Sequence, residues 1–282
     1  MPVSKEERKA EAAKHLSFVK GLFPTETEAA IASVHIYEDG EGRELELPEA
    51  KAEATATSVT TAFAVAALHS AHGKVALVDP ASFTRAGGNY EEGAFGPEQV
   101  LCSESNLYPI LQGINGEYHR KNRGFARGQL FTDRAAYLTD VVFNRDGSIR
   151  NADVIVLPEP NRQRALENHR SEKECDTCLA NRIETLLRIA AANEAETLIV
   201  GAFGTGRQGF PAQQVIKLFK DWIEAHPGSI PNIVFAVPRV HFEAFKEAFG
   251  QPEPVAEEAS FEEQEEDEGF DINDLPEGVT LR

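Results

Sequence analysis

The sequence predicts an α/β fold, a three-layer α/β/α arrangement in which a mostly parallel, mixed sheet lies between two layers of helices. Short apolar segments alternate with longer segments of helical periodicity, which is typical of a parallel sheet with crossover helices. Residues 75–78 are apolar throughout, as expected of a strand buried on both faces. Glycine-rich loops follow two predicted strands, and such sheets bind ligands at the carboxyl ends of their strands.

The first part of the chain predicts three helices and two strands. Residues 5–20 have apolar side chains at helical spacing, with Ser4 as the N-cap and a break at residues 21–24. A short helix is expected at residues 25–32 and strands at residues 34–37 and 55–59. The next helix, at residues 61–72, is expected to pack through Phe63, Val65 and Leu68.

After the central strand at residues 75–78, helices and strands alternate. The polar and basic segment 115–129 is expected to be a loop, and either Arg123 or Arg134 is expected to pair with an internal acid. The helix at residues 176–192 has the strongest pattern, with Leu179, Ile183, Leu186, Leu187 and Ala190 on one side. The other expected helices lie at residues 100–111, 211–225 and 241–249, and the other strands at 152–157, 197–200 and 233–237.

Composition indicates a soluble domain with a separate tail. With 282 residues, 41% of them hydrophobic, the chain can bury a sizeable core, which we place at residues 1–250 with an N-terminal helical extension. There is no run of about 18 apolar residues and no apolar secretory signal, so no membrane association is expected. Three cysteines argue against a disulfide framework and favour a reducing, cytoplasmic location.

The net charge of −18 is concentrated in the tail. Residues 251–282 contain 12 acidic and one basic residue, so they carry −11 and leave −7 on the first 250 residues. A direct grip on duplex DNA through many phosphates is therefore not expected. The tail is predicted to be disordered. Its segment 270–275, Phe-Asp-Ile-Asn-Asp-Leu, is either a short docking motif for a protein partner or part of a solubilising tail.

The first glycine-rich loop carries the candidate chemistry. Asp79 ends the central strand, and Gly87, Gly88, Gly93 and Gly96 follow within the loop. Glycines let the main chain approach a ligand closely. Residue 97 is a proline, which suits the first position of a helix, and an acid follows it in the first turn.

The second loop, residues 201–210, also joins a strand to a helix. Its glycines free backbone N–H groups to face an anion, and the following helix adds its positive end. Together the two loops predict a diphosphate-binding site. The expected ligand-binding residues are Asp79, Gly87, Gly88, Asn89, Gly201, Gly204, Thr205, Gly206, Arg207, Gln208, Gly209 and Phe210.

Taken with its flanks, the first loop resembles the microbial-type poly(ADP-ribose) glycohydrolase family, a branch of the macrodomains. That family has a triple-glycine loop, a Gln-Glu-Glu motif and a Leu-Tyr-containing helix. The corresponding segments here are residues 87–89, 97–99 and 107–108, with no insertion. The likeness continues in order through residues 130–134, 141–147, 154–161, 198–206 and 233–237. The resemblance implies a macrodomain-like fold, ADP-ribose or an ADP-ribosylated macromolecule as ligand, and no cofactor.

The sequence departs from the family pattern at the reacting end. The motif glutamate that the family places in catalysis falls on Gln99, the motif glutamine on Pro97, and the third loop glycine on Asn89. In the second loop, Gln208 stands where the family has an aromatic residue near the terminal ribose. Binding tolerates these changes more easily than hydrolysis does.

Cleavage of a ribosyl bond requires a carboxylic acid that protonates the leaving group or a carboxylate that stabilises an oxocarbenium-like transition state. Gln99 can hydrogen-bond to ribose hydroxyls but cannot act as a carboxylic acid. Glu98, or a displaced carboxylate such as Glu91 or Glu92, would have to take over. Alternatively, Glu98 is only a first-turn helix residue favoured by the helix dipole.

Two further features each have a structural and a functional interpretation. Cys175 and Cys178 form a Cys-x-x-Cys pair, which lacks a second pair to complete a zinc site, so inert thiols and no metal are expected. The basic residues at 119–127 are either a solvated loop or a contact for the phosphates of a longer ADP-ribose chain.

Three hypotheses remain open at this stage. The first is an ADP-ribose-binding protein with altered or lost hydrolysis. The second is an active ADP-ribosyl glycohydrolase that uses Glu98 or a displaced carboxylate on a mono- or poly-ADP-ribosylated substrate. The third is an interaction protein with a vestigial pocket and an acidic tail that binds partners.

Overall fold

The structure, a computed structural model, describes residues 4–250, so the predicted tail at 251–282 and its docking motif lie outside the described residues. Within this range seven strands form one sheet in the order β1-β4-β5-β3-β6-β7-β2. The strands are β1 (His35–Tyr37), β2 (Ala56–Thr60), β3 (Val75–Asp79), β4 (Ala135–Arg145), β5 (Ser148–Val156), β6 (Thr197–Val200) and β7 (Asn232–Ala236).

The sheet is mixed and mostly parallel, as predicted. Strand β3 runs parallel to β5 and β6, and β7 runs parallel to β6 and β2. Strand β4 is antiparallel to both of its neighbours, β1 and β5. The carboxyl ends of the parallel strands therefore meet at one edge of the sheet.

The β4–β5 hairpin is longer than the sequence pattern indicated. Predicted strand 152–157 is only the inner end of β5, and no strand was assigned to residues 135–145. The first four residues of β5 are outside the core, whereas its last five are buried, so only the buried half has a continuous apolar pattern. The hairpin turns at Asp146 and Gly147, both with positive φ, as a two-residue β-turn requires.

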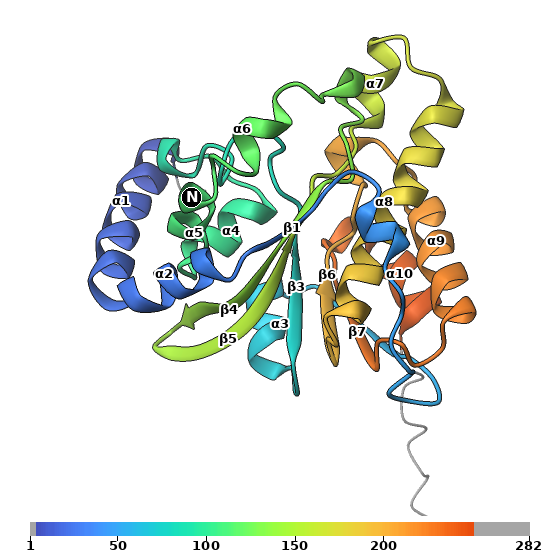
Figure 1. The fold of residues 1–282 in the computed structure, drawn as a ribbon, viewed down its shortest axis with the longest axis horizontal. Coiled ribbons are helices and arrows are strands. Elements are labelled where there is room, and N and C mark those ends of the chain that lie inside the picture. The colour runs from blue at the N-terminus through green and yellow to red at the C-terminus, as the bar shows by residue number, and fades with distance from the viewer. Residues whose placement is uncertain (1–3, 251–282) are drawn as a thin grey trace, which may run out of the picture. The chain divides into compact units, whose positions relative to one another are not determined.

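Helices cover both faces of the sheet (Figure 1). None of those described is long and apolar enough to cross a membrane. They are α1 (Lys5–Leu22), α2 (Pro24–Ala32), α3 (Ala64–Ser70), α4 (Pro97–Ser103), α5 (Leu107–Gly113), α6 (His119–Asn122), α7 (Arg162–Glu167), α8 (Glu172–Ala192), α9 (Ala212–Ala225) and α10 (Arg239–Phe249). Short 3₁₀ turns are η1 (Glu41–Glu44), η2 (Tyr90–Glu92), η3 (Arg127–Gln129) and η4 (Gly206–Gln208).

Three predictions about the helices were wrong in detail. The helix expected at residues 61–72 is the shorter α3, and Phe63 lies before it with 57% of its surface exposed instead of packing in the core. The helix expected at residues 100–111 is divided into α4 and α5, because Asn106 turns away to bond the backbone of Val142. The expected loop 115–129 contains α6 and η3.

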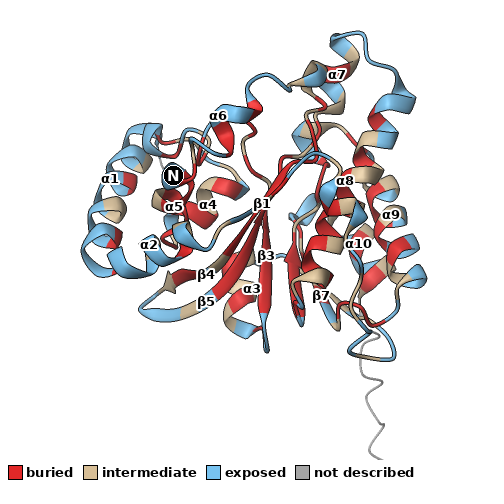
Figure 2. Ribbon diagram, in the orientation of Figure 1, coloured by how far each residue is buried: buried red, intermediate tan, exposed pale blue. Residues whose placement is uncertain are grey.

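The core has one layer on each face of the sheet. Along β3, Ala76 and Val78 pack into the layer under α8, α9 and α10, while Val75 and Leu77 pack into the layer under α3 and α5. This alternation explains why the strand is apolar throughout. Figure 2 shows the central strands buried along most of their length. The predicted stripe of α8 is confirmed, since all five residues named for it lie in the first layer.

Helix α1 docks on the first glycine loop. Its N-terminus is closed by a capping box between Ser4 and Glu7, as the sequence indicated for Ser4. Arg8 Nε donates to the carbonyl of Gly93 at 2.8 Å, and the hydroxyl of Tyr90 lies 3.1 Å from Nδ1 of His15. The N-terminal extension is therefore part of the wall of the loop.

Gly93 tests this docking. It has φ of +73°, and a Cβ at this position would overlap the carbonyl oxygen of Lys5 in α1. We expect Gly93→Ala to lower the free energy of unfolding by more than about 2 kcal/mol, because left-handed strain and a backbone clash act together. Urea unfolding measures the change.

Two glycines serve as controls. Gly147 has φ of +81° but open space, and Gly116 has open space without positive φ. We expect losses of about 1 kcal/mol for Gly147→Ala and below about 0.5 kcal/mol for Gly116→Ala. A Gly93→Ala loss no larger than that of Gly147→Ala would show that α1 is not held rigidly against the loop.

Candidate functional site

The candidate site lies where β3, β5 and β6 end. These strands are parallel neighbours, so the loops that follow them, at residues 80–96, 157–161 and 201–211, emerge at the same edge of the sheet. Each of the first two strands delivers a carboxylate to this edge. Asp79 is the last residue of β3, and Glu159 lies three residues after the end of β5.

In the first loop, glycine makes room for the side chains of α4. Gly87 and Gly88 have φ of +67° and +57°. A Cβ on Gly88 would lie 2.5 Å from Nε2 of Gln99 and 2.9 Å from Oε2 of Glu98. The glycine thus lets both motif side chains lie directly against the loop. The side chain of Asn89 is bonded to Arg85 within the loop.

Glu98 is buried at the start of α4, with 4% of its surface exposed. Its Oε2 accepts from the N–H of Ser82 at 3.1 Å, while Oε1 has no hydrogen-bond partner in the described protein. Burial and the nearby charge of Asp79 raise the pKa of Glu98 well above its usual range, against the opposing effect of the N–H groups of Ser82 and Gly87. A carboxyl in this setting is held in its protonated form.

Gln99 lies beside Glu98 but faces partly outward. Its Nε2 donates to the carbonyl of Gly87 at 3.2 Å and to Oε2 of Glu98 at 3.3 Å. It also lines a cavity of about 530 Å³ between α1 and the first loop, together with His15 and Phe95. The two motif positions are therefore adjacent but differ in environment.

Neither carboxylate oxygen of Asp79 has a hydrogen-bond partner among residues 4–250, although the side chain is completely buried. Burial, followed by the charge of Glu159, raises the pKa of Asp79 to about 8. Unsatisfied buried carboxylates are rare and costly, and they mark sites that bind a ligand or a proton.

Glu159 is the residue that the sequence analysis missed. Its Oε1 accepts from the backbone N–H of Gly204 at 2.8 Å, and its Oε2 accepts from Nε2 of Gln208 at 3.0 Å. Burial raises the pKa of Glu159 to about 7, opposed by these two bonds and by the charge of Arg182. A carboxylate thus occupies one of the N–H donors of the second glycine loop. The signal in the sequence is an acid between two prolines directly after a buried strand.

The rest of the second loop is divided between core and surface. Phe210 is buried in the core and Thr205 donates its hydroxyl to the carbonyl of Ala202 at 2.7 Å. Gly206 and Arg207 are exposed, whereas Gly201 and Gly209 are half-buried. The N–H groups of the exposed part remain accessible to an anion, and Phe210 acts as an anchor for the loop.

The structure brings the two loops together through the three carboxylates. Glu98 is bonded to the first loop and Glu159 to the second, and Asp79 lies close enough to both for their charges to affect one another. Acidic groups that are bonded to each loop therefore lie near one another at this edge of the sheet.

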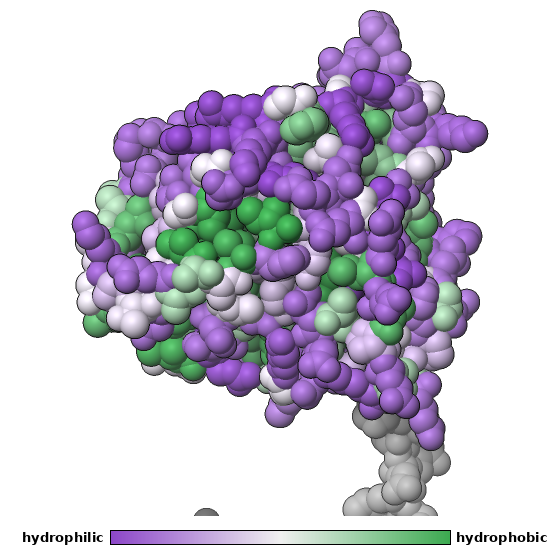
Figure 3. Space-filling view, in the orientation of Figure 1, coloured by the Kyte–Doolittle hydropathy of each residue, from purple (hydrophilic) through white to green (hydrophobic). Residues whose placement is uncertain are grey.

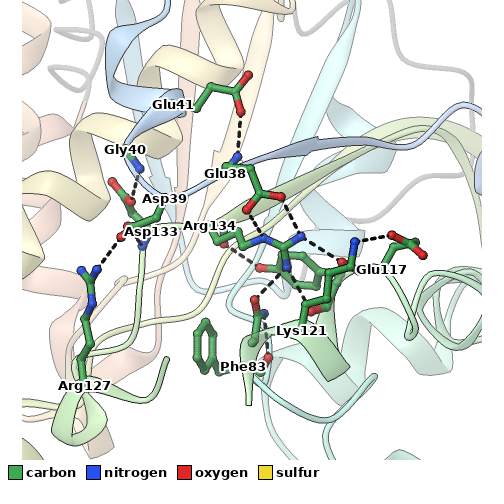
Figure 4. Close-up of polar contacts among 12 residues, drawn as sticks. Glu38, Asp39, Gly40, Glu41, Phe83, Glu117, Lys121, Arg127, Asp133 and Arg134 are labelled. Carbon is green, nitrogen blue, oxygen red and sulfur yellow. Dashed lines mark hydrogen bonds and ion pairs between the residues drawn. The ribbon is translucent and has the colours of Figure 1, made fainter. Parts of the chain in front are cut away.

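The basic segment near the site is mostly structural. His119 and Asn122 are completely buried, and Nδ2 of Asn122 donates to the carbonyl of Phe83 at 2.9 Å. Arg134 pairs with Glu38 through two hydrogen bonds of 2.7 and 3.0 Å, as its expected ion pair, and also contacts the 117–122 segment (Figure 4). This network joins α6 to the end of β1 through the buried residues, whereas the basic side chains of Arg120, Lys121, Arg123 and Arg127 are exposed.

The cysteines show no disulfide among the described residues. Burial raises the pKa of both Cys175 and Cys178, so neither is a ready thiolate. Within residues 4–250 no group of three or more His, Cys, Asp or Glu side chains is arranged to hold a metal ion.

Comparison with known families identifies the pattern of the first half of the chain. Residues 12–146 match the family described as microbial-type PARG, catalytic domain. The matched region includes the first glycine loop, Glu98 and Gln99, but it ends before Glu159 and the second loop. A search of curated proteins finds no match.

Solved structures of bacterial PARGs share the fold. Poly(ADP-ribose) glycohydrolase from Thermomonospora curvata superposes with a TM-score of 0.71 at 23% identity, covering 82% of this chain and 93% of that chain. The enzyme from Deinococcus radiodurans in complex with ADP-ribose gives 0.70 at 23% identity, covering 79% and 96%. The same Thermomonospora protein bound to the inhibitor ADP-HPD gives 0.72 at 24%, covering 86% and 98%. The predicted macrodomain-like fold is confirmed.

The pKa of Asp79 predicts how stability depends on pH. Because its pKa is about 8 in the folded protein and near 4 when unfolded, the unfolded chain loses this proton first, and the free energy of unfolding falls as the pH rises from 4 to 8. We expect Asp79→Asn to remove this loss. Between pH 5 and pH 8 the free energy of unfolding of wild type should therefore fall by more than about 1.4 kcal/mol relative to that of the variant.

Urea unfolding at both pH values measures this difference, with Asp221→Asn on exposed α9 as the control. The comparison uses the change between the two pH values, which cancels any fixed cost of burying the amide. An equal pH response in wild type and Asp79→Asn would show that Asp79 is ionised in the folded protein.

Proposed function

Because residues 12–146 are homologous to the microbial-type PARG catalytic domain, we propose that this chain binds ADP-ribose in the crevice at the strand ends, with hydrolysis altered or lost. The observation that carries the proposal is the meeting of both glycine loops at one edge of the sheet, around Asp79, Glu98 and Glu159. Deinococcus PARG binds ADP-ribose with the same fold, which supports this ligand. The target would be ADP-ribose or an ADP-ribosylated macromolecule.

In this proposal the second loop holds the diphosphate. The N–H groups of Gly204 and Gly206 are the donors and Arg207 lies over the phosphates, whereas the N–H of Gly209 donates to the carbonyl of Gly206 at 3.1 Å. Glu159 has to release the N–H of Gly204 for the phosphate to take it. Since its pKa is about 7, protonation near neutral pH weakens this competition and removes a charge that repels the ligand.

The first loop holds the terminal ribose in the same proposal. Gly87, Gly88 and Asn89 surround it, and Asp79 accepts from a hydroxyl or amino group of the ligand. Gln99 contributes hydrogen bonds to ribose hydroxyls but no carboxylic acid proton. Loss of an acid at this position accounts for altered or lost hydrolysis.

One observation favours an active glycohydrolase as the second candidate. Glu98 adjoins Gln99, and burial together with the charge of Asp79 raises its pKa. Glycosidases keep their general acid protonated in the same way. In this candidate function Glu98 protonates the leaving group and water attacks the ribosyl carbon.

We propose a cytoplasmic location, which the absence of a disulfide among the described cysteines suits. The acidic tail at 251–282 is proposed to contact a protein partner. Binding of duplex DNA is not part of the proposal, because Arg127 and Arg134 near the site are paired with acids.

Calorimetry with ADP-ribose tests binding and the role of Glu159 together. We expect affinity for ADP-ribose to increase as the pH falls from 8 to 6, because Glu159 becomes neutral over this range. Glu159→Gln should bind about tenfold more tightly than wild type at pH 8 and show a flatter pH dependence, since the amide carries no charge, its oxygen can accept from Gly204, and its NH2 group can donate to Gln208 once that side-chain amide is flipped.

Glu224→Gln on the exposed face of α9 removes one charge elsewhere and should leave affinity unchanged. If neither wild type at either pH nor Glu159→Gln releases heat with ADP-ribose, the proposed binding is wrong and the vestigial-pocket hypothesis remains. Binding without any effect of Glu159→Gln would retain the function but remove Glu159 from the site.

Release of ADP-ribose from poly(ADP-ribose) and from mono-ADP-ribosylated protein separates the two candidate functions. We expect little release by wild type and an increase of at least about tenfold for Gln99→Glu, which restores a carboxylic acid at the motif position. Efficient release by wild type that is abolished in Glu98→Gln would instead establish Glu98 as the acid. ADP-ribose binding by each variant serves as the folding control.

A further inference from the structure

A second cavity lies apart from the proposed nucleotide crevice. It has a volume of about 520 Å³ and is enclosed by the turn after β1, by residues 127–133 and by the first half of α8. None of the residues that line it belongs to either glycine loop. Figure 3 shows a mostly hydrophilic surface over α7 and the beginning of α8, near the wall of this cavity, whereas apolar atoms gather over α4 and α5.

The lining of this cavity is positive, although the protein as a whole carries a net charge of −18. Three acids line it, and each is bonded to a lining arginine: Asp133 to Arg43 at 2.6 Å, Asp39 to Arg127 at 2.6 Å, and Glu174 to Arg170 at 3.1 Å. Two further lining cations, Lys173 and Arg182, have no carboxylate partner among residues 4–250. The lining therefore carries a net charge of about +2, although the charge of Arg182 also acts on Glu159 outside the cavity.

Arg182 is the buried one of these two cations, with 1% of its surface exposed. Its guanidinium donates to the carbonyls of Pro158 and Leu130, but its Nε has no hydrogen-bond partner in the described protein. A buried N–H group without an acceptor is costly, and an anion or another ligand can supply the acceptor.

The wall of the cavity also contains unusual backbone. Arg127, Gln129 and Phe131 all have positive φ, at +44°, +76° and +62°, although none is glycine. Such strain clusters at ligand sites, where the surrounding structure holds it. Here the segment is fixed by the bond of Arg127 to Asp39, which Figure 4 shows reaching the end of β1, and by a bond from the N–H of Asn161 to the carbonyl of Gln129.

We propose that this cavity is a second oxyanion site that binds a phosphate group, either free phosphate or a phosphomonoester. Lys173 and Arg182 supply the positive charge that is not paired within the lining, and guanidinium groups match the geometry of phosphate oxygens. The positive end of α8, a helix of 21 residues, adds to the same field. The volume exceeds that of one oxyanion, so it leaves room for the organic part of a phosphomonoester.

The loop after β5 links this cavity to the proposed nucleotide crevice. Arg182 and Gln129 hold the loop after β5, the loop that carries Glu159. The inference does not depend on the proposed function, because the cavity, its charges and its wall are separate from both glycine loops.

Calorimetry of the full chain at low ionic strength tests the site, with inorganic phosphate in one experiment and ribose 5-phosphate in another. We expect binding of at least one of these compounds and a Kd about tenfold higher or more in Lys173→Glu. Lys220→Glu, which changes an exposed lysine of α9 by the same charge, should alter the Kd less than about twofold. Tighter binding of ribose 5-phosphate than of phosphate would identify a phosphomonoester as the ligand, and the reverse would identify the free anion.

Arg182→Gln should weaken phosphate binding as strongly as Lys173→Glu does. If Arg182→Gln does not fold, Lys173→Glu, which changes a surface residue of α8, still tests whether the cavity binds phosphate. No heat with either compound, or equal weakening by Lys173→Glu and Lys220→Glu, would overturn the proposal. Phosphate binding that ADP-ribose abolishes and Lys173→Glu leaves intact would assign the phosphate to the glycine loops instead. Measuring the ADP-ribose affinity of Lys173→Glu distinguishes failure of the phosphate site from failure of the proposed function, because an unchanged affinity shows that ADP-ribose binding is intact.

Discussion

The candidate site depends on the withdrawal of three carboxyl groups from water, Asp79 at the end of β3, Glu98 at the start of α4 and the half-buried Glu159 after β5. Burial is the main cause that raises the pKa of each, and the charge of Glu159 adds to the shift of Asp79 as the charge of Asp79 adds to that of Glu98. Such a cluster is tolerated because protons and backbone N–H groups compensate part of its charge. The glycines of the two loops supply some of these N–H groups, which is why the loops are arranged as they are around the strand ends.

This arrangement has an electrostatic consequence for any anionic ligand. An ADP-ribose diphosphate approaching the second loop meets Glu159 on the N–H of Gly204, so binding is coupled to the protonation or displacement of that carboxylate. At the other end, Gln99 and Glu98 divide between them the properties that a catalytic acid needs. Gln99 has the motif position and partial exposure, and Glu98 has the carboxyl and the raised pKa.

Two arginines, Arg134 and Arg182, hold together the segments that lie near this edge of the sheet. Arg134 fixes α6 to the end of β1, and Arg182 fixes the loop after β5 to the segment that follows η3. Both guanidinium groups donate to backbone carbonyls, Arg134 to that of Glu117 and Arg182 to that of Pro158. Positive charge is thus placed behind the loops, where it supports the acidic crevice without lining it.

The sequence by itself determined the layered α/β fold, because the apolar run of β3 and the stripe of α8 each allow only one environment. It also located both glycine loops at the ends of their strands. The β4–β5 hairpin was missed because half of β5 extends beyond the core, and burial is what gives a strand its apolar pattern. Only the tertiary structure decided the roles of Glu159 and Arg182, since the N–H of Gly204 lies 45 residues from Glu159 and the carbonyl of Leu130 lies 52 residues from Arg182. A charge or a hydrogen bond depends on distance in space, and a single sequence records only distance along the chain.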